Sequence, residues 1–253
     1  MGGFEIFAII APALVAGFMI SLINGPLGIE VLRRGIIFID LAIAQVASLC
    51  VLFIDLYAHE NSVFTRQASA FGAALLMALF FRIIEKKLPN EREPIIGACF
   101  ILAASAVLLA LANHPHGGEK MQDVLAGQIL LVSWWEVLAF APIFIVAQIA
   151  WFRWPAIRTG AGFYAIFSAV ITASVQIAGI YVVFASLIFP ALAVSTIKSK
   201  KAFFAIICGW LSVIFGVINS IWTDMPIGPL IVFGAALTTL VFRGLIFVKI
   251  KYK

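Results

Sequence analysis

Long apolar blocks separated by short polar segments run along the whole sequence. A helix needs about 20 residues to cross about 30 Å of hydrocarbon, and most of the blocks have that length. The pattern predicts spans over residues 4–32, 36–57, up to 84, up to 112, 133–152, two within 162–197, one up to 222 and one up to 248. We therefore expect an all-α, polytopic transmembrane bundle of about 8–9 spans.

Local signals mark several ends of these spans. Residues 85–94 combine charges with two prolines, which marks a loop. Ser133 followed by Glu136 has the spacing of a capping box and predicts a helix start. Residues 124–132 are apolar but too few to cross, so we expect them to lie along the surface or to re-enter. Asp224 is the predicted N-cap of the last span, with Pro226 in its first turn.

The basic residues give the bundle an orientation. They concentrate at residues 33–34, 86–92, 153–158 and 198–201 and at the C-terminus, and basic loops remain on the cytoplasmic side. Placing all of these segments on one side requires about nine crossings with the N-terminus outside. Eight is the alternative, because residues 162–197 make either two full passes or one pass and a re-entrant half-helix.

Composition supports a membrane location for nearly the whole chain. Of 253 residues, 64% are hydrophobic and 11% are charged, and the mean hydropathy is +1.13. Soluble proteins contain about a quarter charged residues. We expect residues 1–253 to form a single transmembrane domain. The sequence has no GxxxxGK[ST] loop, HExxH or GxSxG motif, so we expect a transport subunit that is not an enzyme.

Asp40 is the strongest candidate for a residue of a solute pathway. An ionisable group inside an apolar span is costly unless it faces a partner or a wet cavity. At helical spacing Asp40 shares a face with Ala44 and Ala47, whose small side chains leave room for a solute or for a close helix contact. The alternative is a structural carboxylate held by polar neighbours. An oxygen ligand without imidazole or thiolate favours manganese or another hard cation over zinc.

Other polar residues have both a functional and a structural interpretation. Gln45, beside the Asp40 face, is a second candidate metal ligand, although buried amides such as Gln45 and Gln176 commonly bond to a neighbouring helix. Asn24 precedes the Gly25–Pro26 pair, which predicts either exposed carbonyls or a plain kink.

His114 and His116 are the remaining candidate metal ligands. With Glu119 and Asp123 they supply the ligand types that capture a divalent cation at the outer face. Alternate histidines in a Pro- and Gly-containing segment also occur as a solvated turn.

Several segments carry a resemblance to a known family. Gly25-Pro26-Leu27-Gly28, followed by the sequence around Arg33 and Asp40, resembles the first two helices of the permease subunit of ABC transporters for zinc and manganese. Residues 119–137, 175–191 and 224–229 resemble that family's central segment, its apolar stretch before Pro-Ala, and its Asp-x-Pro-x-Gly-Pro turn, in the same order.

The resemblance implies a division of labour between proteins. A permease of this kind forms a homodimeric pore in the bacterial inner membrane and works with a separate cytoplasmic ATPase and an extracytoplasmic metal-binding protein. It has no tightly bound cofactor, and a zinc or manganese ion is the expected cargo. No nucleic-acid partner is implied.

Two departures from the family pattern bear on function. The family typically has Gly-Asp at the second helix with His four positions later, whereas here Ile39 precedes Asp40 and Ala44 occupies the later position. The cytoplasmic link at residues 153–161 is also shorter than in many members. The alternative function is a stand-alone channel or secondary transporter that reuses the fold without an ATPase.

Overall fold

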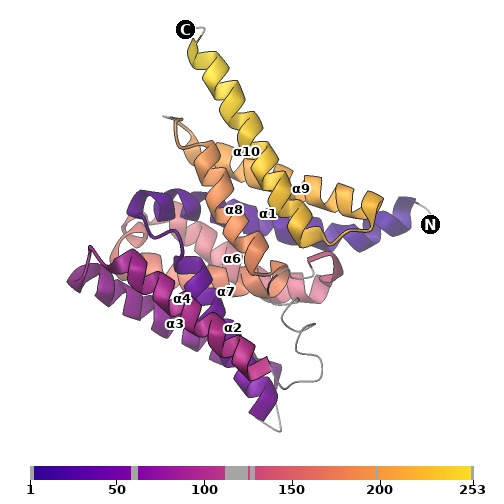
Figure 1. Cartoon of the computed structure of the whole chain (residues 1–253). Coiled ribbons are helices and arrows are strands. Elements are labelled where there is room, and N and C mark those ends of the chain that lie inside the picture. Colours follow the sequence, from indigo (N-terminus) through magenta and orange to yellow (C-terminus); the bar gives the residue numbers. More distant parts are fainter. Residues whose placement is uncertain (1–2, 58–61, 112–124, 126–128, 198, 252–253) are drawn as a thin grey trace.

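The computed structural model describes residues 3–57, 62–111, 125, 129–197 and 199–251 (Figure 1). All regular structure in this part of the chain is helical, which confirms the predicted all-α bundle. The helices are α1 (Gly3–Arg34), α2 (Ile39–Tyr57), α3 (Val63–Lys87), α4 (Arg92–Leu111), η1 (Ile129–Leu131), α6 (Trp134–Arg153), η2 (Pro155–Arg158), α7 (Gly160–Ala178), α8 (Ile180–Ala193), α9 (Lys201–Thr223) and α10 (Ile227–Lys251), where η marks a 3₁₀ turn.

Most of the helices satisfy the requirements for crossing a membrane. Seven in the described part are long and apolar enough by length and composition. Of the other two α-helices there, α2 has 19 residues with Asp40 and Asp55 near its ends, and α8 has 14 residues. The bundle is therefore polytopic, as the apolar blocks predict.

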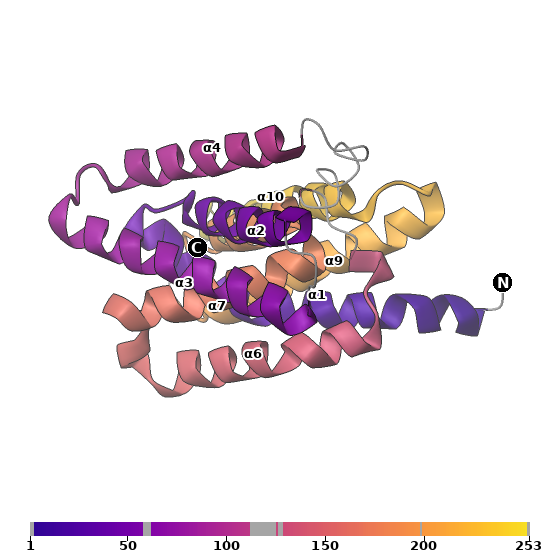
Figure 2. The same ribbon diagram turned by 90° about the horizontal axis from the view of Figure 1, so that it is seen from below.

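The links that follow α1, α3 and α6 lie toward one end of the bundle (Figure 2). Arg34, which ends α1, bonds to Glu85 near the end of α3 and to the carbonyl of Arg158 before α7. The start of α1 lies at the opposite end in both ribbon views. Three of the predicted basic segments therefore lie together at one end, and their cytoplasmic location stays a prediction.

Residues 162–197 form one full pass and a shorter return. At 1.5 Å per residue, α7 is about 28 Å long and α8 about 21 Å. Gly179 separates them with φ 78°, in the region where glycine has no steric penalty. The predicted break around residues 176–179 is thus a tight reversal between two helices.

The local signals at helix ends have mixed outcomes. The Ser133–Glu136 capping box is confirmed, because the Ser133 N–H donates to Glu136 Oε2 at 2.8 Å and the Glu136 N–H donates to Ser133 Oγ at 3.3 Å. Ile129–Leu131 is a short 3₁₀ turn packed against α1, and Ile129 is buried. The N-cap prediction for Asp224 is wrong. Asp224 ends α9 in a left-handed conformation with φ 53°, which a short polar side chain tolerates, and α10 begins at Ile227.

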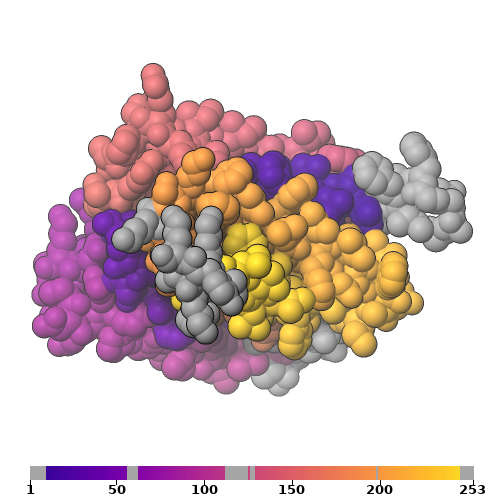
Figure 3. Space-filling model, turned by 90° about the horizontal axis from the view of Figure 1, so that it is seen from above, coloured from indigo at the N-terminus to yellow at the C-terminus, as the bar shows by residue number. Residues whose placement is uncertain are grey.

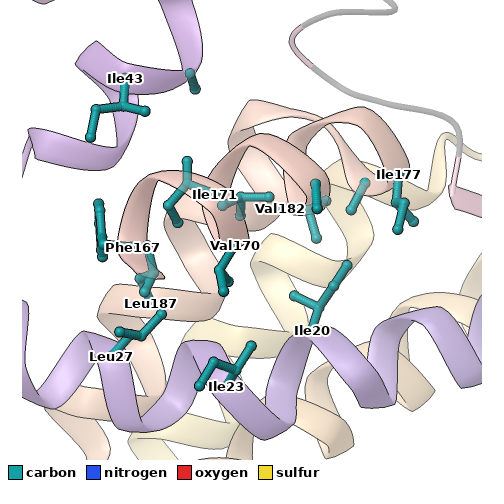
Figure 4. Packing of buried hydrophobic residues seen from close by; sticks show 14 of the residues in the cluster. Ile20, Ile23, Leu27, Ile43, Phe167, Val170, Ile171, Ile177, Val182 and Leu187 are labelled. Carbon is teal, nitrogen blue, oxygen red and sulfur yellow. The ribbon is translucent and has the colours of Figure 1, made fainter. Parts of the chain in front are cut away.

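The core is built around α1, α7 and α8 (Figure 4). Ile23 and Leu27 of α1 belong to the same buried cluster as Val170 of α7 and Leu187 of α8. A side chain on Gly28 would overlap the carbonyl oxygen of Leu187, so α1 and α8 meet backbone to backbone at this point. Small residues at helix contacts are typical of membrane bundles, where close packing replaces the hydrophobic effect.

Large apolar side chains cover much of the outer surface. Leu76 of α3, Leu109 of α4, Trp135 of α6 and Leu240 of α10 are among the most exposed. Seen from the side toward which α10 points, α8, α9 and α10 lie side by side, with α6 at one edge and α3 and α4 at another (Figure 3). An apolar surface of this extent is typical of a protein whose faces contact lipid or another protein chain.

Candidate functional site

Asp40 lies in the first turn of α2, which begins shortly after α1 ends at Arg34. Only 1% of the residue is exposed. The backbone N–H groups of Asp40 and Leu41 lie against its carboxylate, as expected for an acid at a helix N-terminus. The oxygen Oδ1 has no hydrogen-bond partner in the described part of the chain. Asp40 is therefore a buried acceptor with capacity for a further donor or cation.

A cavity of about 370 Å³ lies along α2, on the helix face that Asp40 shares with Ala44 and Ala47. Ala44 and Ala47, the two small residues on that face, line it, so the predicted room is present. The other lining residues are Ser48, Val51, Leu52 and Asp55 of α2, Arg66 and Ala70 of α3, and Thr172, Val175 and Gln176 of α7. Asp40 does not line the cavity. It lies one helical turn before Ala44, which is the first residue of α2 in the lining.

The ends of α2 and α3 away from the basic links form the polar rim of the cavity. Arg66 Nη2 lies 3.0 Å from Asp55 Oδ2, and both side chains are partly exposed. Gln176 was expected to be a buried amide, but it is exposed near the end of α7, where its Nε2 donates to the Thr172 carbonyl at 3.3 Å. Thr172 Oγ1 is buried and has no partner among the described residues.

Glu93 brings a second carboxylate close to Asp40, and it was missed by the sequence analysis. It lies in the first turn of α4, and its Oε1 accepts the Phe38 N–H at 3.3 Å just before α2. Its Oε2 has no partner in the described part of the chain. The two carboxylates are close enough for their charges to repel. Only the packing of α4 beside α2 creates this proximity, so no sequence spacing indicates it.

The other predicted candidates have different outcomes. Gln45 is 2% exposed, and its Oε1 has no partner among the residues described. His114 and His116 lie outside the described residues. Asn24 donates to Ser186 Oγ at 2.8 Å and so joins α1 to α8. In the part of the chain that is described, no three His, Cys, Asp or Glu side chains form a group that could hold a metal ion.

Arg34 is the centre of a polar network at the basic end. Its guanidinium bonds to Glu30 at 2.8 Å and Glu85 at 3.2 Å, and it donates to the Arg158 carbonyl at 2.8 Å. It also lies 4.1 Å from the centre of the Phe163 ring. The network thus joins the Glu30–Arg34 ion pair of α1 to α3 and to the link before α7.

Comparisons with known proteins agree with this architecture. The model of the ABC 3 transport family matches residues 6–159 and 155–247. No curated protein sequence matches the chain significantly.

Two solved structures share the fold. PsaBC from Streptococcus pneumoniae, in complex with a Fab, has a TM-score of 0.71 and 15% identity, over 95% of this chain and 92% of that one. A structure described as an inward-facing metal-chelate type ABC transporter has a TM-score of 0.62 and 14% identity, over 96% of this chain and 86% of that one.

Proposed function

Because the chain belongs to the ABC 3 transport family, we propose that it is the permease subunit of an importer for a divalent metal ion of the zinc or manganese class. Membership makes it a multi-pass protein of the bacterial inner membrane and a transport subunit, distinct from the ATPase. The observation that carries the metal assignment is Asp40, a buried carboxylate with an unpartnered oxygen beneath a cavity.

In this proposal the cargo moves along the Asp40 face of α2. Ala44 and Ala47 provide space, and Asp40 and Gln45 provide oxygen ligands for the ion. Of these two metals, oxygen donors favour manganese over zinc. In this proposal, His114 and His116 capture the ion at the outer face before it enters.

Three partners complete the importer. A cytoplasmic ATPase supplies energy, an extracytoplasmic binding protein delivers the metal, and a second copy of the chain forms the other half of the pore. The basic end offers the ATPase the exposed residues of the short link between α6 and α7, such as Arg153 and Trp154. No resident cofactor is required.

The short link and Ala44 favour a second candidate function, a channel or secondary transporter that works without an ATPase. The two functions differ in their dependence on a partner. An importer subunit copurifies with an ATPase, and the turnover of that ATPase rises when the metal-loaded binding protein is added. A permease that binds no ATPase and transports without nucleotide supports the second function.

A further inference from the structure

The cavity between α2, α3 and α7 has more space than a metal ion needs. Its volume of about 370 Å³ is many times the space that a single water molecule needs. A volume of this size is typical of sites for small organic molecules.

The described lining is also poorly suited to an ion stripped of its ligands. Asp55 is its single carboxylate, and that carboxylate is paired with Arg66, so the described lining has no net charge. The remaining polar groups are the hydroxyls of Ser48 and Thr172 and the amide of Gln176. A divalent cation that loses its water needs four to eight protein donors, mostly charged, imidazole or thiolate groups.

The same groups suit a cargo that brings its own ligands. Arg66 binds carboxylates in a planar, two-pronged geometry, and it is partly exposed at the rim, where it can exchange Asp55 for another carboxylate. Thr172, 1% exposed, has a hydroxyl without a partner in the described part of the chain, and Gln176 presents an amide. Both are hydrogen-bonding groups for the outer oxygens of a complex.

We propose that the cavity binds the metal as a neutral or anionic complex with a small di- or tricarboxylate. Arg66 holds a free carboxylate of the chelator, Thr172 and Gln176 orient the complex, and Ala44 and Ala47 set the size limit. The inference rests on the proposed function and specifies the form of its cargo. A complex also enters a membrane interior at lower cost than a bare dication, because its charge is already compensated.

Equilibrium dialysis with radiolabelled citrate tests this proposal on the full chain in lipid nanodiscs. We expect about one citrate per chain when one equivalent of manganese is present. Arg66→Gln should weaken citrate binding by about tenfold, the effect of losing one charge-assisted contact. Ala47→Phe should abolish it by filling the cavity. Lys87→Gln removes an exposed positive charge at the other end of α3; it is the matched control and should bind as the wild type does.

Two results would overturn the inference. One is citrate binding at background while radiolabelled manganese binds fully in a buffer without a chelator. The other is unchanged citrate binding in Arg66→Gln and Ala47→Phe, with both variants monodisperse on size exclusion. Failure of the parent proposal is distinguishable, because cellular manganese uptake would then be absent with citrate and without it. If manganese uptake occurs but changes neither with citrate nor in the two cavity variants, the chain is still a metal importer. Only the proposal that the metal enters as a carboxylate complex is then rejected.

Discussion

At the scale of single residues, Asp40 separates the functional from the structural interpretation. Its burial, the two backbone N–H groups beside it and the unpartnered Oδ1 agree with a helix-start acid that retains binding capacity. A purely structural carboxylate would normally have both oxygens satisfied, since each unsatisfied buried atom costs stability. The unpartnered oxygen Oδ1 of Asp40 is therefore the feature to test.

Asp40→Asn removes the charge of this side chain and keeps its shape. We expect metal uptake to fall by at least about tenfold, because an amide oxygen is a weaker cation ligand than a carboxylate. Uptake of radiolabelled manganese by cells, normalised to the amount of protein in the membrane, measures the effect. Asp224→Asn is the control, since Asp224 is exposed at the other end and asparagine also tolerates its left-handed backbone. Equal uptake in both variants would remove Asp40 from the pathway.

Residue-scale predictions from the sequence have a clear limit. The sequence analysis selected Asp40 and Gln45 correctly as buried polar residues, because charges and amides are rare in apolar blocks. It did not identify Glu93, which lies within the charged segment 85–94 and looks solvated in the sequence. It also interpreted Asn24 as a kink or a carbonyl site, whereas Asn24 bonds to Ser186, 162 positions away. Partners on distant helices leave no local pattern.

At the scale of helices, Arg34 links α1 to α3 and to the segment before α7 through side-chain bonds. Arg34→Ala leaves the carboxylates of Glu30 and Glu85 without this partner in a partly buried site. We expect a loss of about 3 kcal/mol of stability, the cost of breaking a buried ion pair from one side. Thermal unfolding in detergent measures it.

The matched control for Arg34 is Arg153→Ala, which removes an exposed arginine at the same end. Adding Glu85→Ala to Arg34→Ala should recover part of the loss, because one uncompensated charge is removed. A transition temperature for Arg34→Ala equal to that of Arg153→Ala would contradict the role of the network.

Gly28 tests the backbone contact between α1 and α8. Gly28→Ala would place a methyl group against the Leu187 carbonyl, and α8 must then move. We expect a loss of about 3 kcal/mol, at the upper end for overpacking. Gly72→Ala in α3 is the control, because a methyl group there meets open space and should be neutral or slightly stabilising. Similar melting temperatures for the two variants would show that α1 and α8 do not meet in this way.

Helix-scale structure was the most predictable from sequence. Apolar blocks located the spans because the hydrocarbon thickness fixes their length, and the Ser133–Glu136 spacing located the start of α6. The Asp224 prediction failed because the same residue types end one helix as well as begin the next. The cavity could not be predicted, since its walls come from three helices whose relative placement depends on packing.

At the scale of the whole molecule, the two ends of the bundle differ: one end has the basic links, and the cavity opens toward the other. The links around Arg34, Glu85 and Arg158 join at one end, and the cavity rim at Asp55 and Arg66 lies toward the other. A transporter that admits cargo at the outer face and meets its ATPase at the cytoplasmic face requires this polarity. The same polarity predicts that the Asp55–Arg66 rim is accessible from outside.

We propose that this chain moves a divalent metal only when an ATPase drives it. Proteoliposomes that contain the chain, the ATPase that copurifies with it and the metal-binding protein test this most directly, through uptake of radiolabelled manganese. We predict uptake that begins on addition of ATP and falls to background when the ATPase is left out. Uptake at the same rate from liposomes that contain the chain alone, without nucleotide, would contradict the account.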